Sequence, residues 1–379
     1  MNFEEYAAKP LLSLGGINIP EGRLVKKSAE AFKAASDLGK VVIKAQVPVG
    51  KRGKAGGIQM ADTGASARAH AESIIGMDIG GFEVNKVLVE QQFNIEREFY
   101  AAVLNDPASK GPIILFSTEG GMDIEEITFS RPDRLRKLEV DIRAGIDHTQ
   151  LFSLIEGLSL DGLESSIADV LFKLFQIYQA NDAELIEINP LIVTSDKELV
   201  ALDCKFVMDD SGIKRQEKLA KSGTPEKLSN LEEKGEQNSI KYIELNGDVG
   251  ILANGAGLTM TTMDVVRHYG GKPANFCEIG GEAYTKAKIA LGLVLEKPGV
   301  KSLVVNFCGA FARCDVMMEG LLNAWDELSP DLPVFFSIAG TGDEEAISML
   351  KARLGLDPFS DMDAASKAAV EAAALIGEG

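Results

Sequence analysis

Residues 184–205 read ELIEINPLIVTSDKELVALDCK, two runs in which apolar and polar residues alternate on either side of a polar turn at 194–198. A period of two predicts a pair of β-strands, because successive side chains of a strand point to opposite faces. We expect a hairpin roughly symmetric about Asp196, with one apolar face against a core. The residues predicted on that apolar face are Ile186, Ile188, Ile192, Val200, Leu202 and Cys204.

The other face of this hairpin is polar and charged. The symmetric register sets Asn189 opposite Asp203 and Glu187 opposite Lys205. A carboxylate and an amide oxygen that lie close together suit a Mg²⁺ ion that carries the phosphates of a nucleotide. The alternative is a hairpin face that simply contacts water.

Length and composition limit the kinds of protein that this chain can be. A length of 379 residues predicts two or three domains, and the abundance of Ala and Gly is typical of soluble α/β enzymes. No apolar run is long enough to cross a membrane and the first residues lack a secretory signal, so we expect a cytoplasmic protein. A net charge of −18 argues against a nucleic-acid or anionic-membrane partner. Four scattered cysteines without a CxxC motif argue against structural zinc and disulfides.

The N-terminal half contains a basic loop after a predicted strand. Asn2 and Glu5 have the spacing of a capping box, which predicts a first helix that Pro10 should end or kink. The run at 40–46 predicts a buried strand, and the loop at 48–57, PVGKRGKAGG, follows it. Backbone amides and cations of such a loop can surround phosphates, although a Gly/Lys loop alone is more often a mobile turn.

The C-terminal half alternates short apolar runs with helical patterns beyond a polar, boundary-like stretch at 214–241. This alternation predicts a parallel, doubly wound sheet, whose ligands bind at the carboxyl ends of the strands. The segment NGAGLTM at 254–260 lacks the third glycine of a dinucleotide fingerprint, so we do not expect NAD. The predicted strand ends carry residues 254–257, 280–281, 308–310 and 340–342.

The motifs EINP at 187–190 and LDCK at 202–205 resemble the metal-binding hairpin of the ATP-grasp fold. The whole chain, from NFEEYAAKPLL at 2–12 onward, resembles the β subunits of succinyl-CoA synthetase (succinate–CoA ligase) and related acid–thiol ligases. The resemblance implies an α/β protein with an α+β ATP-grasp domain at 1–235. A doubly wound, flavodoxin-like CoA-ligase domain at 236–379 would follow it.

The resemblance also implies roles for particular residues. Asn189 and Asp203 would bind Mg²⁺, and Glu187 would orient a histidine that visits the nucleotide site. A salt bridge from Glu187 to Lys205 is the structural alternative. Glu90 would lie beside the base and Glu98 near the ribose. The full set implied to contact ATP or GTP is Lys44, Lys51, Arg52, Gly53, Glu90 and Glu98, and the set implied to shape the acid site is Asn254, Gly309, Ala310, Phe311 and Ala312.

The chain has three histidines, His70, His148 and His268, and none follows a predicted strand in a glycine-rich loop. The resemblance implies that the phosphorylated histidine and most of the CoA site belong to an α subunit, in a heterodimer or a heterotetramer. We therefore expect this chain to bind nucleotide and Mg²⁺ but not to complete the reaction alone. A nucleotide-binding regulatory subunit is an alternative, although it should have lost the metal pair. A stand-alone carboxylate–amine ligase fits residues 1–235 only.

Two departures from the family pattern leave the acid open. In NFCGAFARCD at 306–315, Ala310 replaces a glycine and Phe311 an aliphatic residue, and AGTG at 339–342 replaces a turn that contains Glu-Gly. Phe311 could point into the acid pocket or into the core. Succinate is the first expectation, and malate, citrate or another dicarboxylate is the alternative.

Overall fold

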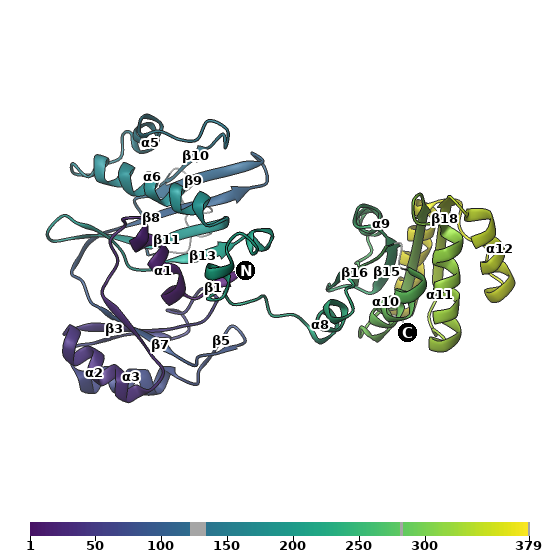
Figure 1. The fold of residues 1–379 in the computed structure, drawn as a ribbon, viewed down its shortest axis with the longest axis horizontal. Coiled ribbons are helices and arrows are strands. Elements are labelled where there is room, and N and C mark those ends of the chain that lie inside the picture. The colour runs from purple at the N-terminus through teal and green to yellow at the C-terminus, as the bar shows by residue number, and fades with distance from the viewer. Residues whose placement is uncertain (122–133, 281–282, 378–379) are drawn as a thin grey trace. The chain divides into compact units, whose positions relative to one another are not determined.

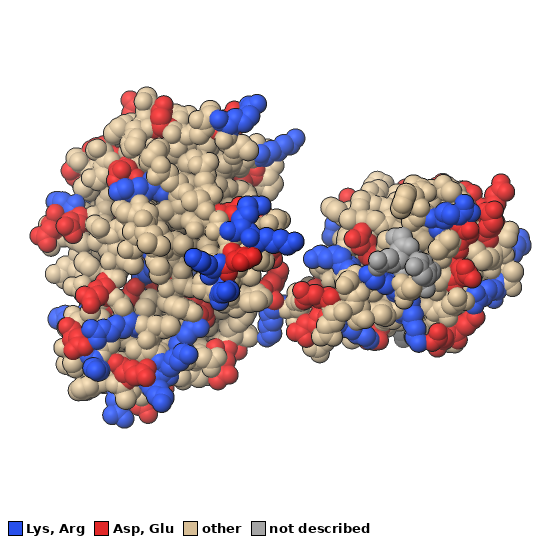
Figure 2. Space-filling model, viewed as in Figure 1, with Lys and Arg blue, Asp and Glu red and all other residues tan. Residues whose placement is uncertain are grey.

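The computed structural model describes residues 1–121, 134–280 and 283–377, so Gly281, expected at a strand end, lies outside the described residues. The chain divides into two compact units, Met1–Glu226 and Lys227–Gly379. The division falls inside the polar stretch at 214–241. No helix among the described residues is long and apolar enough to span a membrane. Figure 2 shows cationic and anionic side chains interspersed on the viewed face of each unit.

The first unit contains a seven-stranded sheet within its described residues. The strands in spatial order are β1 (Asn2–Phe3), β13 (Lys205–Met208), β11 (Ala183–Thr194), β8 (Ile95–Asp106), β9 (Gly111–Ser117) and β10 (Leu135–Glu139), with β12 (Leu199–Ala201) paired to β11. Helix α6 (Glu164–Ala180) packs its apolar side chains on this sheet, and α5 (His148–Ile155) lies beside it (Figure 1).

A second, four-stranded antiparallel sheet carries the basic loop. Its order is β2 (Gly22–Val25), β7 (Val87–Gln91), β3 (Val41–Ala45) and β4 (Ile58–Ala61), and α2 (Ser28–Leu38) and α3 (Gly64–Ile74) cover it. The small pair β5 (Asp78–Ile79) and β6 (Phe82–Glu83) follows α3. Helix α1 (Glu5–Leu14) lies between the two sheets (Figure 1).

The hairpin register is confirmed where strands form. Glu187 is the partner of Lys205, and Leu191 is the partner of Ala201. Residues 202–204 leave the strand between β12 and β13, so Asp203 is not a ladder partner of Asn189. The predicted apolar residues are buried except for Leu202, which is half-buried. The pairing register with β8 shifts between Ile188 and Leu191, and beyond it Leu191 and Val193 join the core cluster that contains Ile186 and Ile188. Ile192 and Val200 are buried outside that cluster, so the prediction of one apolar face holds only for the near half of the hairpin.

The start of the chain differs from the predicted capping box. Asn2 pairs with Val207 in β1, so its side chain does not cap α1. The helix begins at Glu5, has Glu4 at the cap position, and continues through Pro10 to Leu14. The capping-box prediction was wrong because Asn2 belongs to a β-strand that pairs with β13.

The second unit confirms the doubly wound sheet. Its order is β14 (Tyr242–Glu244), β16 (Asn275–Ile279), β15 (Val249–Asn254), β17 (Ser302–Gly309) and β18 (Val334–Gly340). All pairs are parallel except β14 with β16, an edge that the sequence did not predict. Helices α9 (Ala256–His268) and α13 (Met362–Gly377) cover one face, and α10 (Ala283–Glu296) and α11 (Cys314–Leu328) cover the other. The remaining α-helices among the described residues are α7 (Glu217–Ala220) in the first unit, and α8 (Asn230–Gln237) and α12 (Asp343–Leu354) in the second.

Candidate nucleotide and metal site

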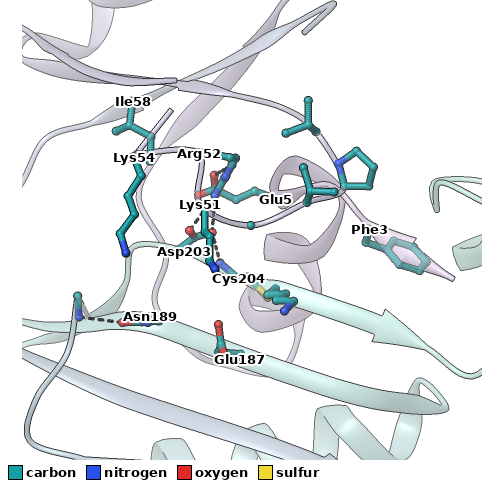
Figure 3. A pocket seen from close by; sticks show the side chains of 17 residues that line it. Phe3, Glu5, Lys51, Arg52, Lys54, Ile58, Glu187, Asn189, Asp203 and Cys204 are labelled. Atoms are coloured by element: carbon teal, nitrogen blue, oxygen red, sulfur yellow. Dashed lines mark hydrogen bonds and ion pairs between the residues drawn. The ribbon is translucent and has the colours of Figure 1, made fainter. Parts of the chain in front are cut away.

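The basic loop and the hairpin face each other across a cavity of about 310 Å³ in the first unit (Figure 3). Lys54 extends from the loop into the space facing Asn189 (Figure 3). The cavity brings together most residues that the sequence predicted for nucleotide and metal. Its polar lining includes Lys51, Arg52, Lys54, Glu187, Asn189 and Asp203.

A cluster of buried charges lies behind this cavity. Lys9 Nζ lies 2.7 Å from Glu5 Oε1 and 2.5 Å from Glu90 Oε1. Lys44 Nζ, on β3, lies 2.9 Å from Glu5 Oε1 and 2.8 Å from Glu90 Oε2, and it also donates to the carbonyl of Leu202. The four charged residues are each less than 10% exposed. Removing one partner of such a buried pair costs about 3–5 kcal/mol, since the other charge stays buried.

Arg52 connects this cluster to the cavity. Its Nη1 donates to Glu5 Oε2 at 2.6 Å and to the carbonyl of Ala45 at 3.0 Å. Its Nη2 donates to both oxygens of Asp203, at 2.8 and 2.7 Å. The Asp203 side chain is 32% exposed, whereas that of Glu5 is 1% exposed. One guanidinium therefore bridges a buried carboxylate and a carboxylate at the cavity wall.

Glu5, Lys44 and Arg52 stay ionised because the opposite charges around them outweigh the effect of burial. Burial raises the pKa of the Glu5 carboxyl, but its three cationic neighbours hold that pKa well below its ordinary value. Burial lowers the pKa of Lys44 and Arg52, but the neighbouring carboxylates outweigh it and raise both values. Each group thus carries its charge at neutral pH.

The hairpin residues also have protein contacts. The Tyr100 hydroxyl donates to Glu187 Oε2 at 3.0 Å, and the Gly121 amide donates to Asn189 Oδ1 at 2.8 Å. Glu187 and Lys205 are ladder partners, as the symmetric register predicts.

Two predicted nucleotide contacts lie apart from the cavity lining. Glu90 is 2% exposed, and its carboxylate forms ion pairs with Lys9 and Lys44. Glu98 lies against the turn at Gly121, where an added Cβ would come within 2.2 Å of its Oε2. The structure therefore brings together Lys51, Arg52, Gly53, Glu187, Asn189 and Asp203 in the lining, with Lys44 directly behind it.

Sequence reasoning missed Glu5, Lys9 and Lys54. Glu5 lines the cavity although it belongs to α1. The four-residue spacing of Glu5 and Lys9 is the spacing of an ion pair on a helix, and it was visible in the sequence. Nothing local indicates that this pair is buried, because such pairs are usually exposed.

The predicted acid-site residues lie at strand ends of the second unit. Asn254 closes β15 and exchanges two hydrogen bonds with the backbone of Cys308, at 2.9 and 2.7 Å. Gly309 ends β17 beside Gly340, and an added Cβ would lie 2.3 Å from the Thr341 carbonyl oxygen. This close approach explains the glycine.

A strand-to-helix turn joins Gly309 to α11. The Ala310 amide donates to the Ala312 carbonyl at 3.1 Å, so the turn itself uses that donor. Ala312 packs on the core, whereas Phe311 is 104% exposed. Phe311 therefore does not pack into the core, and its ring is exposed to solvent.

Comparison with known proteins assigns a domain family to each of the two units. Residues 2–193 match the ATP-grasp domain family and residues 252–375 match the CoA-ligase family. ATP citrate lyase from Methanothrix soehngenii, solved with citrate and coenzyme A, has the same fold, with a TM-score of 0.68 and 22% identity over 98% of this chain and 99% of that one. An ATP-grasp domain followed by a CoA-ligase domain defines a chain of the nucleotide-dependent acid–thiol ligase class.

Relatives with higher sequence identity show which family of this class the chain belongs to. The GDP-forming succinate–CoA ligase subunit beta of Thermus thermophilus is 41% identical, over 93% of this chain and 94% of that protein. The ADP-forming subunit beta of Roseiflexus sp. (strain RS-1) is 40% identical, over 98% of this chain and 99% of that protein. The chain belongs to the family of succinate–CoA ligase β subunits.

Proposed function

We propose that this chain is the nucleotide-binding β subunit of a succinate–CoA ligase. With an α-type subunit it would convert succinate, CoA and ATP or GTP into succinyl-CoA, ADP or GDP, and phosphate. The observation that carries the proposal is the cavity in which the basic loop faces Asn189 and Asp203. Lys51 and Arg52 supply positive charge for phosphates in a chain whose net charge is −18.

Mg²⁺ fits the donors at this cavity. Asn189 and Asp203 offer hard oxygen ligands, which this ion prefers. The described residues contain no group of three or more His, Cys, Asp or Glu side chains that could hold a metal. Phosphate oxygens and water would therefore complete the coordination. When bound, the ion would offset the negative charge of the phosphates.

Glu187 is proposed to orient the histidine of the α-type subunit. A carboxylate that accepts a hydrogen bond from one ring nitrogen leaves the other nitrogen as the nucleophile. The hydrogen bond from Tyr100 fixes the Glu187 carboxylate at the cavity wall. The histidine would take the terminal phosphoryl group and release ADP or GDP.

The phosphohistidine would then phosphorylate the acid. A carboxylate oxygen is a poor leaving group, and phosphorylation makes it a good one. The CoA thiolate attacks the acyl carbon of the resulting acyl phosphate, and the carbon–oxygen bond breaks to release phosphate. The strand-end residues Asn254 and 309–312 are proposed to lie beside the acid at this step.

The test compares the purified chain with and without an α-type subunit. The chain alone should bind Mg-nucleotide but form no succinyl-CoA, because none of its three histidines lines the cavity. Both subunits together should form succinyl-CoA from succinate. Efficient synthesis by this chain alone, or none by the pair, would contradict the proposal.

A further inference from the structure

Glu5 is a buried carboxylate on α1 to which the proposed mechanism assigns no task. We propose that Glu5 is a positioning residue, which anchors Arg52 so that Asp203 can pass from Arg52 to a divalent cation when nucleotide binds. The inference rests on the proposed function of the cavity.

The donors of Arg52 show why an exchange is needed. Its Nη1 already donates hydrogen bonds to Glu5 and to the Ala45 carbonyl, and its Nη2 donates to both carboxylate oxygens of Asp203. A guanidinium has five N–H donors, and four of them are therefore engaged. The Nη1 and Nη2 groups of Arg52 can donate hydrogen bonds to a phosphate only after one of these four hydrogen bonds is broken.

Exposure decides which contact is given up. The Glu5 side chain is 1% exposed and the Asp203 side chain is 32% exposed. A hydrated cation can approach Asp203 from the cavity, whereas the Glu5 carboxylate is almost fully buried and held by Lys9, Lys44 and Arg52. When the cation takes Asp203, Nη2 of Arg52 is released toward the cavity and Nη1 keeps its two partners. A phosphate then replaces Asp203 on Arg52, so every charge retains a counter-ion.

Glu5 is suited to be the fixed partner in this exchange. Its carboxylate also lies 2.7 Å from Lys9 Nζ and 2.9 Å from Lys44 Nζ, so three cations hold it in place. Without that carboxylate, Asp203 would be the sole charged partner of the buried guanidinium. Releasing Asp203 would then leave Arg52 buried without a counter-ion, which is costly. Arg52 would therefore compete more strongly with the cation.

The experiment measures binding to the full-length chain. A fluorescent ADP analogue at fixed concentration is titrated with Mg²⁺, for the native chain and for Glu5→Gln. The half-saturating Mg²⁺ concentration should rise roughly tenfold or more, the scale of one charge-assisted hydrogen bond. In an Asp203→Asn background, Glu5→Gln should produce no further shift, because the exchange partner is already gone.

Glu4→Gln is the matched control. Glu4 precedes Glu5 at the start of the same helix, pairs with Lys86 at 2.6 Å and does not line the cavity. It should leave the Mg²⁺ requirement unchanged. If Glu5→Gln fails to fold, the variant Glu5→Asp is used in its place. Aspartate keeps the negative charge but moves the carboxylate away from Arg52, so the half-saturating Mg²⁺ concentration should rise by a smaller factor.

The outcomes separate this inference from the proposed function. If the native chain binds the ADP analogue without any dependence on Mg²⁺, or not at all, the proposed function of the cavity fails and the inference fails with it. If the native chain shows the dependence but the Glu5 variants share its Mg²⁺ requirement, only the inference is overturned. A lower melting temperature with an unchanged Mg²⁺ requirement is such a result, since it indicates a merely structural residue.

Discussion

The cavity of the first unit and the strand-end loops of the second are built in opposite ways. Around the cavity, charged side chains from α1, β3, the basic loop and the hairpin contact one another directly. At the strand ends, backbone approaches backbone, as where Gly309 meets Gly340, and Phe311 is fully exposed. The first region holds its charges in place before any ligand arrives, while the second offers mainly a shaped backbone. Substitutions should therefore affect phosphoryl chemistry in one region and stability or acid preference in the other.

The largest effect should come from Asp203→Asn. Asparagine removes the one charged metal donor of the proposed pair, so phosphorylation of the α-type subunit should slow by roughly 100-fold or more. Because Asp203 also pairs with Arg52, the free energy of unfolding should fall by about 1–3 kcal/mol. Rapid-quench kinetics and urea unfolding measure the two effects.

Asp196→Asn is the control for that experiment, since Asp196 lies exposed in the turn of the same hairpin. It should behave as the native chain. Native phosphorylation rates for Asp203→Asn at low Mg²⁺ would refute the metal assignment.

Glu187→Gln should have the next largest effect. The change keeps the size of the side chain but removes the charge that orients the histidine, so phosphorylation by nucleotide should slow by roughly 10- to 100-fold. Transfer from phosphohistidine to the acid should be spared. Glu184→Gln, an exposed residue of the same strand, is the control. Equal slowing of both half-reactions would mean that Glu187 is merely structural.

Gly309→Ala tests the backbone-built region. The added methyl group meets the Thr341 backbone, so the second unit should lose about 1–3 kcal/mol of stability. Trp325, the one tryptophan in the sequence, lies on α11 and reports unfolding of this unit by fluorescence. Gly292→Ala on α10 has room for its methyl and should not destabilise. Equal stability of the two variants would show that the strand ends can move apart.

The smallest effect should come from Phe311→Ile. The ring is exposed rather than part of an apolar pocket of this chain, so the order of acids should hold. The ratios of kcat/KM for succinate, malate, itaconate and citrate on the two-subunit enzyme should change by less than about tenfold. Succinate should lead for both proteins. A tenfold lead for citrate or malate in the native enzyme would overturn the choice of acid.

Local patterns predicted the elements well and their surroundings poorly. Period-two alternation predicted the hairpin register, including Glu187 opposite Lys205, because a strand pair is determined by nearby residues. The burial of Glu5 and Lys9 depends on two sheets far apart in sequence, so no local signal predicted it.

The candidate site shows the same limit. The cations of the basic loop and the acid and amide of the hairpin were identifiable as a set, since their chemistry suits Mg-nucleotide. The sequence could not show that the Arg52 guanidinium already pairs with the Asp203 carboxylate, because the two residues lie 151 positions apart in the chain. Likewise, the exposure of Phe311 depends on a single turn between β17 and α11.

The central claim is that this chain delivers a phosphoryl group to a histidine of another subunit. Incubation of both subunits with Mg²⁺ and ATP or GTP carrying a labelled terminal phosphate tests it most directly. The label should appear on the α-type subunit only when this chain is present, and succinate with CoA should discharge it as phosphate. Label that accumulates on this chain, or labelling of the α-type subunit in its absence, would contradict the account.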